Sequence, residues 1–324
     1  MELIRGLHNL KPRHHGCVAT IGNFDGVHLG HQAVAGQLAE KAQALRLPTL
    51  VILFEPQPQE FFRPDKSPPR LTRFREKWLA LRRYSVDRVL CIRFDARFAA
   101  MEPETFVSRV LVDGLGVQHL VVGDDFRFGK NRRGDFALLQ QMGQRHNFQV
   151  ANMHTVTIDS ERVSSTRVRA ALNIGDLATA EKLLGRPYRM SGRVAHGLKL
   201  GRRLGIPTAN IHVYRKATPI TGVYVVEVFG LEREPWPGAA NVGTRPTING
   251  TRTLLEIHLL DFDGHIYGKY LNVNFLHKLR DEERYDSLDE LKMHMSSDLD
   301  RARAFFQDYH PQQTQLESGN DVVG

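Results

Sequence analysis

The periodicity of apolar residues changes near residue 187, and this change constrains the fold more than any other feature of the sequence. Before it, apolar runs (CVATI, TLVILF, RVLCI, HLVVG, FQVANMHTV) alternate with helical patterns near residues 29–46, 71–84, 103–114 and 133–145. Apolar strands separated by helices predict a parallel sheet covered on both faces. We therefore expect an α/β domain that binds its ligands at the carboxyl ends of the strands.

The second half alternates apolar and polar residues, as in GVYVVEVF, LLEIHLLDF and LNVNFLHKL, between Gly, Pro and Asn turns. Such a pattern from Tyr188 to Leu279 predicts an antiparallel barrel or sandwich. A helix-like stretch, TRVRAALNIGDLATAEKLLG, precedes it, and Ser287 with Glu290 three positions later predicts a capped helix after it. Two domains suit a chain of 324 residues. We expect them at 1–185 and 186–310, followed by a flexible tail at 311–324.

The charge and the cysteines indicate the class of protein. The net charge is +8, but the basic residues form no long run, so a solvated basic surface or a polyphosphate cleft is favoured over a nucleic-acid interface. Cys17 and Cys91 lie in apolar strand-like runs and are expected to be buried thiols of a cytoplasmic protein. No apolar run is long enough to span a bilayer, so no membrane partner is expected.

Two histidines stand at the start of the first expected helix, in GNFDGVHLGH. His28 and His31 lie three residues apart, so their rings face the same way, next to unpaired N–H groups and the positive end of the helix dipole. The glycines allow backbone to approach a ligand closely. This combination predicts a polyphosphate site in which the imidazoles stabilise developing negative charge. A zinc site, or a pair of ordinary core histidines, remains an alternative.

A glycine-rich basic run, GRVAHGLKLGRRLGIPTANI, dominates the second half. The run fits a loop around an anion, or an ordinary glycine-rich turn. If a strand starts here, Thr208 and Asn210 share one face and offer neutral oxygen ligands suited to Mg²⁺. In LLEIHLLDF, Glu256 points away from the apolar face of its strand, where a carboxylate can face a cleft or simply solvent.

The motifs of the first half resemble those of the prokaryotic bifunctional riboflavin kinase/FAD synthetase family. GNFDGVHLGH is similar to its extended nucleotidyltransferase signature, which implies catalytic roles for the two histidines. VGDDFRFG resembles its flavin-facing loop, and SSTRVR a second phosphate-binding element. The resemblance implies that nucleotide and phosphate are bound by Gly22, Asn23, Asp25, Gly30, Ser165, Thr166 and Arg169, and flavin by Asp125 and Phe126. Gln57 in FEPQP departs from the family, where His is common.

The second half resembles the riboflavin kinase signature G-R-x-L-G-x-P-T-A-N. That resemblance implies phosphate contacts from Gly201 and Arg202, and ATP–magnesium contacts from Thr208 and Asn210. Glu256 looks like the family's general base, which a ribityl hydroxyl needs because an alcohol is a poor nucleophile until it loses its proton. LRDEERYDSLDEL is similar to a flavin-side loop, with Arg280 and Glu282 at the matching positions.

The resemblance extends from about residue 15 to 308. It implies a Rossmann-like nucleotidyltransferase domain, which adenylylates FMN to FAD, and a flavokinase-like barrel, which phosphorylates riboflavin to FMN. ATP and Mg²⁺ would serve both steps. Three alternatives remain: a chain with one working half, a nucleotidyltransferase for a phospho-sugar or phospho-alcohol, and a flavin- or RNA-binding protein without catalysis.

Overall fold

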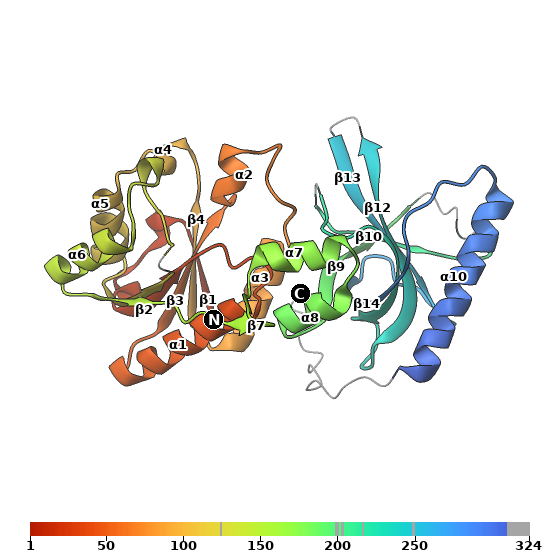
Figure 1. The fold of residues 1–324 in the computed structure, drawn as a ribbon, viewed down its shortest axis with the longest axis horizontal. Helices are drawn as coiled ribbons and strands as arrows, with labels where there is room; N and C mark the ends of the chain where they lie inside the picture. The colour runs from red at the N-terminus through yellow and green to blue at the C-terminus, as the bar shows by residue number, and fades with distance from the viewer. Residues whose placement is uncertain (124, 198–200, 202–203, 216, 248–249, 310–324) are drawn as a thin grey trace. The chain divides into compact units, whose positions relative to one another are not determined.

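The computed structural model describes residues 1–123, 125–197, 201, 204–215, 217–247 and 250–309, without the side chains of 245–247 and 250–252. Its contacts divide the chain into two compact units (Figure 1). One comprises Met1–Pro68 and Lys77–Ser164, and the other comprises Pro69–Glu76 and the chain from Ser165 onward. The expected tail at 311–324 lies outside the described residues, as does Arg202.

The N-terminal unit is built on a six-stranded sheet in the order β1-β4-β3-β2-β5-β6, and every pairing in it is parallel. The strands are β1 (Glu2–Arg5), β2 (Cys17–Ile21), β3 (Thr49–Glu55), β4 (Arg88–Arg93), β5 (Val117–Val122) and β6 (Gln149–Asn152). The helices of this part are α1 (Leu29–Leu45), α2 (Pro58–Phe62), α3 (Phe74–Leu81), α4 (Ala96–Ala99), α5 (Pro103–Phe106) and α6 (Phe136–His146). The predicted α/β architecture is therefore confirmed.

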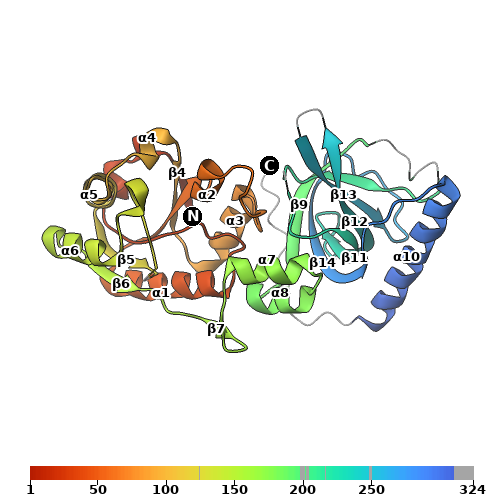
Figure 2. The same ribbon diagram turned by 45° about the horizontal axis from the view of Figure 1, so that its top comes forward.

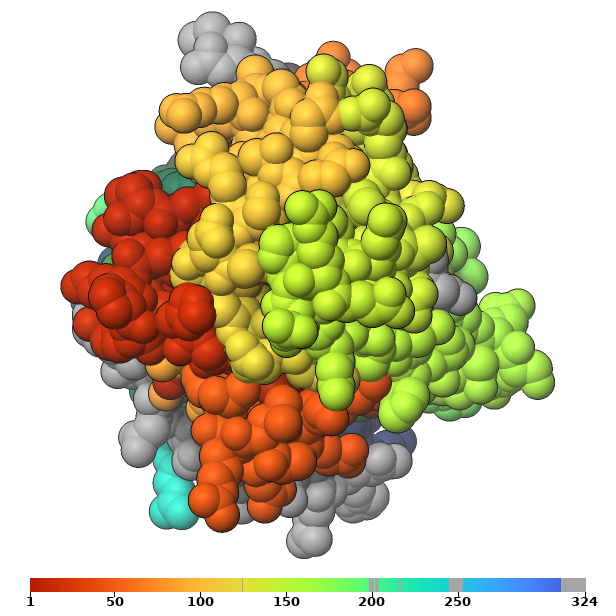
Figure 3. All heavy atoms as spheres, turned by 90° about the vertical axis from the view of Figure 1, so that its left-hand side faces the viewer, coloured from red at the N-terminus to blue at the C-terminus, as the bar shows by residue number. Residues whose placement is uncertain are grey.

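The sheet is apolar on both faces because helices cover both. Every residue of β2 is buried. On one face, strand residues such as Ala19 and Leu120 pack with Phe106, Leu111 and Leu139 from the α5 and α6 regions, while α1 contacts β2, β3 and β5. Figure 3 shows the outer surface of this unit, where α1 (orange-red) and the α5–α6 region (yellow to yellow-green) form a continuous covering.

Several expected boundaries in this unit were wrong. The helix expected at 71–84 begins at Phe74, and the one at 103–114 changes after Phe106 into a π-helical stretch, Val107–Val112. The last expected strand stops at Asn152 and is followed by a short hairpin, β7 (Thr157–Ile158) and β8 (Glu161–Arg162). Cys17 is fully buried, as expected, but Cys91 of β4 is only partly buried.

The C-terminal unit contains a closed antiparallel barrel in the order β10-β13-β12-β11-β14-β9, seen from a second direction in Figure 2. Its strands are β9 (Tyr188–Ala195), β10 (Ala209–His212), β11 (Gly222–Phe229), β12 (Trp236–Thr247), β13 (Gly250–Leu259) and β14 (Tyr270–Arg280). Closure selects the barrel from the two predicted alternatives. The single helix-like stretch before it forms two helices, α7 (Ser165–Asn173) and α8 (Leu177–Leu184). Gly175 separates them at φ 79°, and the Asp176 side chain caps the start of α8.

The helices α7 and α8 group with the barrel rather than with the sheet, because α8 contacts β9 and β14. The last helix, α10 (Leu288–Asp308), contacts β11, β12 and β14. It starts as expected: the Ser287 hydroxyl accepts a 3.1 Å hydrogen bond from the Glu290 N–H. Its apolar face, including Leu299 and Ala302, packs with Val223, Val225 and Ala239 of the barrel wall.

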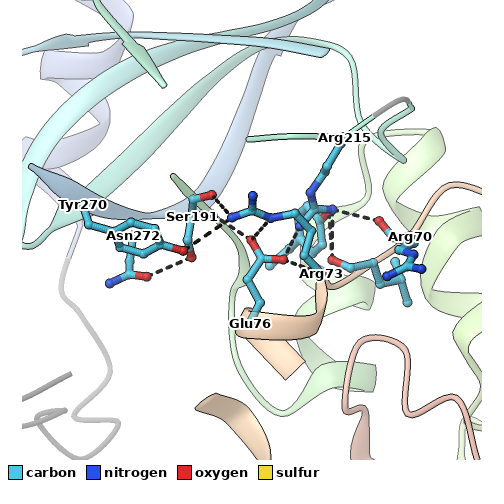
Figure 4. A network of polar contacts seen from close by, with 9 residues as sticks. Arg70, Arg73, Glu76, Ser191, Arg215, Tyr270 and Asn272 are labelled. Carbon is cyan, nitrogen blue, oxygen red and sulfur yellow. Dashed lines mark hydrogen bonds and ion pairs between the residues drawn. The ribbon is translucent and has the colours of Figure 1, made fainter. Parts of the chain in front are cut away.

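The segment Pro69–Glu76 belongs to the barrel unit because a buried ionic network fixes it there (Figure 4). Arg215, which follows β10, donates to Glu76 at 2.7 Å and to the carbonyls of Arg70 and Leu71 at 2.8 and 3.1 Å. Arg73 donates to the Ser191 carbonyl at 2.9 Å. Sequence periodicity gave no sign that this segment would leave the first unit.

No helix among the described residues is long and apolar enough to cross a membrane.

Candidate active sites

The loop that leads from β2 into α1 has an unusual backbone. Phe24, Gly26 and Val27 all adopt positive φ angles of 48°, 85° and 45°. Two of these residues carry side chains that disfavour that region, and such strain is typically found at functional positions. The Gln32 side chain supports the loop by donating to the Val27 carbonyl at 3.0 Å. This contact ties the loop to the first turn of α1, at the carboxyl end of β2.

The two histidines lie together at the start of α1, as their spacing predicts. His28 is the N-cap residue and His31 lies in the first turn, with ring centroids 3.7 Å apart and an interplanar angle of 22°. Phe24 stacks on the other side of His31 at 4.6 Å. A Cβ on Gly30 would approach the His28 ring to 3.1 Å, which explains the glycine between them.

No group of three His, Cys, Asp or Glu side chains among the described residues is placed to hold a metal ion. In that part of the chain the histidine pair therefore has no third ligand of these types.

A large cavity of about 1150 Å³ opens in the N-terminal unit next to this loop. Gly22 and Asn23 line it, as do Asp125 and Phe126 of the expected flavin loop. Asp25 does not line it and is only 2% exposed, so its carboxylate is buried within the loop. The apolar wall is mainly aromatic and is formed by Phe54, Phe62, Phe94, Phe98, Phe106, Phe126 and Phe128. Such a wall suits a flat conjugated ligand.

The charged groups of this cavity are mostly positive. Arg63, Lys66 and Arg132 line it, and Asp125 is the acidic residue of the lining. The Asp125 carboxylate lies 3.6 Å from Arg162 of the β7–β8 hairpin. A cavity with this charge balance favours an anionic ligand. Gln57 is buried outside the lining, and its backbone N–H donates to Glu60 at 2.9 Å.

The expected second phosphate-binding element opens α7. Ser165 is the first residue of the helix, Thr166 is exposed, and Arg169 follows one turn later. The Arg169 Nε donates to the Pro69 carbonyl at 2.8 Å. These three residues belong to the barrel unit, whereas the histidine loop belongs to the other unit.

A second cavity of about 360 Å³ lies in the barrel unit and brings together most of the residues predicted from the second half. Gly201, Thr208, Asn210, Glu256, Arg280 and Glu282 all line it. The strand register explains the central part: Asn210 of β10 and Asn241 of β12 are the cross-strand partners of Glu256 on β13. Leu255 and Ile257 are buried, so Glu256 points to the opposite face of its strand, as the alternation predicts, and there it lines the cavity.

The loop before β10 is folded tightly. The Gly201 carbonyl accepts hydrogen bonds from the N–H groups of Leu204 and Ile206, at 3.1 and 2.8 Å. A Cβ on Gly201 would overlap the Ile206 carbonyl and approach the Thr208 hydroxyl to 3.1 Å. Glycine is therefore required here because the turn returns onto itself beside Thr208.

Arg280 and Glu282 occupy the cavity rim. The Arg280 guanidinium forms a two-pronged ion pair with Asp298 of α10, with Nε–Oδ1 and Nη2–Oδ2 distances of 3.0 and 2.7 Å. These contacts raise the pKa of Arg280 against the opposing effect of burial. The Glu282 carboxylate lies against Gly243 of β12, where a Cβ would overlap it. Arg280 thus links the rim to the last helix.

The oxygen donors in this cavity suit magnesium. Thr208 and Asn210 offer neutral oxygens and Glu256 a carboxylate, and hard divalent cations prefer such ligands. Mg²⁺ usually keeps several waters and takes its remaining ligands from substrate phosphates, so few protein groups are needed.

Sequence reasoning missed several residues of both cavities. His258 lines the barrel cavity, and burial lowers the pKa of its imidazole. Its position on the Glu256 face was visible in the strand alternation. Asn241 of β12 also lines this cavity. The aromatic wall of the first cavity comes from separate elements, so no local pattern revealed it.

Comparisons with known proteins agree with the two-unit architecture. Residues 10–167 match the family model described as FAD synthetase, and residues 184–306 match the model described as riboflavin kinase.

Among curated proteins, relatives from several bacteria are named bifunctional riboflavin kinase/FMN adenylyltransferase. The Pseudomonas fluorescens protein is 53% identical, covering 94% of this chain and 97% of its own. The Escherichia coli K12 protein is 52% identical (94% and 98%), and the Haemophilus influenzae protein 49% identical (94% and 99%).

A solved structure of a Streptococcus pneumoniae protein named macrolide-efflux protein also matches. It has a TM-score of 0.78 and 27% identity, over 96% of this chain and 100% of that one. The likeness covers both units, so the arrangement of elements within each unit has a counterpart in a solved structure. Two family models over successive parts of the chain, and close relatives over nearly its whole length, agree: the chain belongs to the bifunctional riboflavin kinase/FMN adenylyltransferase family.

Proposed function

We propose that this chain makes FAD from riboflavin in two steps at two separate sites. The barrel cavity phosphorylates riboflavin to FMN, and the N-terminal cavity adenylylates FMN to FAD with release of pyrophosphate. One observation carries the proposal. Each unit has its own cavity. The first is lined by Gly22 and Asn23 of the histidine loop, and the second by Gly201, Thr208 and Asn210 of the glycine-rich run. By sequence we assign residues 1–185 to adenylyl transfer and 186–310 to the kinase, while Pro69–Glu76, α7 and α8 of the first range pack within the barrel unit.

In the adenylyl transfer, an FMN phosphate oxygen attacks the α-phosphorus of ATP, and the bond to pyrophosphate breaks. The FMN phosphate is already ionised near neutral pH, so this step needs positioning and charge neutralisation but no base. We assign donation to the α-phosphate and pyrophosphate to His28 and His31. Gly22, Asn23 and Gly30 allow close approach of the phosphates. Asp25 is buried, so we assign it to holding the loop that binds the nucleotide.

The aromatic cavity is the flavin site of this step. Phe126 offers a face for stacking the isoalloxazine ring, and Asp125 offers an acceptor at the cavity surface. Ser165, Thr166 and Arg169 would donate to and neutralise nucleotide phosphate at the start of α7.

In the kinase step, the ribityl hydroxyl oxygen attacks the γ-phosphorus of ATP, the bond from that phosphorus to the bridging oxygen of ADP breaks, and Glu256 accepts the hydroxyl proton. Gly201 and Arg202 belong to the phosphate loop. Thr208 and Asn210 would bind Mg²⁺ together with ATP phosphates. Magnesium at this point supplies charge neutralisation of the transferring phosphate. Arg280 and Glu282 would form the flavin side of the site.

The decisive test is a time course with purified protein, riboflavin, ATP and Mg²⁺, analysed chromatographically. We expect FMN to rise first and then to give way to FAD. Accumulation of FMN alone would remove the adenylyl-transfer assignment. No turnover, with flavin still bound, would favour the binding-protein alternative.

Removal of Mg²⁺ by a chelator is expected to abolish formation of both FMN and FAD in the same assay. Unchanged rates after chelation would contradict the metal assignment.

A variant at the histidine pair tests the separation of sites. His28→Ala is expected to lower FAD formation from FMN by about 100-fold or more, because one preorganised donor to the transition-state charge is lost. FMN formation from riboflavin is expected to stay within about twofold of wild type, because Glu256 lies in the other unit. Equal loss of both activities would argue against two independent sites.

We also propose a reducing cytoplasm as the location, which is supported by two cysteines that form no disulfide.

A further inference from the structure

The pairing of β10 with β13 ends at Ala209, within the Pro-Thr-Ala-Asn motif. The register pairs Asn210 with Glu256 and Ala209 with Ile257, and there the backbone ladder stops. Pro207 has no N–H and cannot continue it. At this point a side chain replaces the backbone: His258 Nδ1 lies 2.8 Å from the Pro207 carbonyl oxygen.

This contact determines that the Nδ1 atom of the His258 imidazole carries a proton. A carbonyl oxygen only accepts hydrogen bonds, so Nδ1 of His258 carries the proton and donates it. His258 lies on the same face of β13 as Glu256, and both line the cavity with Thr208 and Asn210. The Pro207 carbonyl that accepts this hydrogen bond belongs to the peptide bond immediately before Thr208. Its orientation therefore helps to determine where the Thr208 hydroxyl points.

We propose that His258 is a positioning residue of the kinase site: its Nδ1–H holds the Pro207–Thr208 peptide so that Thr208 faces the phosphates of ATP. The proposal rests on the proposed kinase function of this cavity. It connects the strand of the proposed base with the segment that carries Thr208 and leads into β10. Nothing in the chemistry of the step requires His258 to touch the substrate.

Two substitutions separate this role from simple packing. Asn places an amide N–H at the position of Nδ1 and retains the donor, whereas Gln places its amide near the position of Nε2 and loses it. We expect His258→Asn to keep kcat/KM for ATP in the kinase reaction within about threefold of wild type. We expect His258→Gln to lower it about tenfold, the effect of one lost hydrogen bond, mainly through KM.

The control residue is His265, an exposed histidine of the same unit that is not part of the cavity lining. His265→Gln is expected to leave all kinetic constants unchanged. FMN adenylylation, measured on the same samples, is expected to stay constant in every variant and reports intact protein.

A measurement without turnover distinguishes positioning from stability. In a Trp78→Phe background, Trp236 of β12 is the remaining tryptophan, so its fluorescence reports unfolding of the barrel. With ADP and Mg²⁺ added, wild type and His258→Asn should gain the same increase in unfolding midpoint, and His258→Gln a smaller one. Without nucleotide, wild type and His258→Asn should have the same midpoint, and the midpoint of His258→Gln should fall by no more than the effect of one hydrogen bond.

The possible results lead to different conclusions. Equal kinetics for Asn and Gln variants, or a lower midpoint of both without nucleotide, would overturn the positioning role while leaving the kinase assignment intact. Absence of riboflavin phosphorylation by wild type would instead overturn the proposed function itself.

Discussion

Glu256→Gln is expected to lower riboflavin phosphorylation by about 100- to 10,000-fold, the usual contribution of a general base. The substitution keeps the size of the side chain and its place between Asn210 and Asn241, but an amide accepts no proton at neutral pH. FAD formation from added FMN should remain at the wild-type rate, because that reaction needs no base. The measurement is the initial rate of each step, assayed separately with riboflavin or with FMN.

Asn241→Ala is a useful companion to this variant. It removes a neighbour of Glu256 on the same cavity but leaves the carboxylate in place. We expect a much smaller loss of phosphorylation than in Glu256→Gln. A Glu256→Gln enzyme with nearly normal FMN production would show that another group, or water, accepts the hydroxyl proton.

Glu76→Gln is expected to destabilise the barrel unit by about 3 kcal/mol, although it lies far from the kinase motifs in sequence. Its carboxylate accepts from the Arg215 guanidinium at 2.7 Å, the Ser191 N–H at 2.9 Å and the Arg73 N–H at 2.7 Å (Figure 4). The Arg215 side chain is only 2% exposed and that of Glu76 7%. Removing one charge of a buried pair leaves the other poorly compensated, which typically costs several kcal/mol.

A double variant tests whether the charge pair is responsible. Glu76→Gln with Arg215→Met removes both charges, and we expect it to be more stable than Glu76→Gln alone. Asp261→Asn is the matched control, because its 3.1 Å ion pair with Arg303 is solvent-exposed. We expect less than about 1 kcal/mol from this control.

Denaturant unfolding in the Trp78→Phe background measures these effects on the barrel unit alone, through Trp236. A Glu76→Gln midpoint equal to that of the Asp261→Asn control would show that the network contributes little, and that packing alone holds Pro69–Glu76 against the barrel unit.

The sequence predicted the class of each unit because the two halves bury their residues in different patterns. A parallel sheet covered on both faces needs strands that are apolar throughout, as in Cys17–Ile21. A barrel strand alternates, as in Leu255, Glu256 and Ile257. Local chemistry was also visible: the glycine beside His28 and the Ser287 cap both follow from interactions a few residues apart. Periodicity could not place element ends accurately, since these depend on neighbouring elements.

The sequence by itself therefore determined the order of elements, the two chemical motifs and the direction in which Glu256 points, because each depends on residues close together in the chain. Only the tertiary structure decided which separate segments meet. It brought phenylalanines from several elements into one cavity wall, placed His258 against Pro207, and joined Pro69–Glu76 to the barrel through Arg215. The physical reason is that these contacts arise from strand register and buried charge pairing between distant residues, which leave no periodic signal in the sequence.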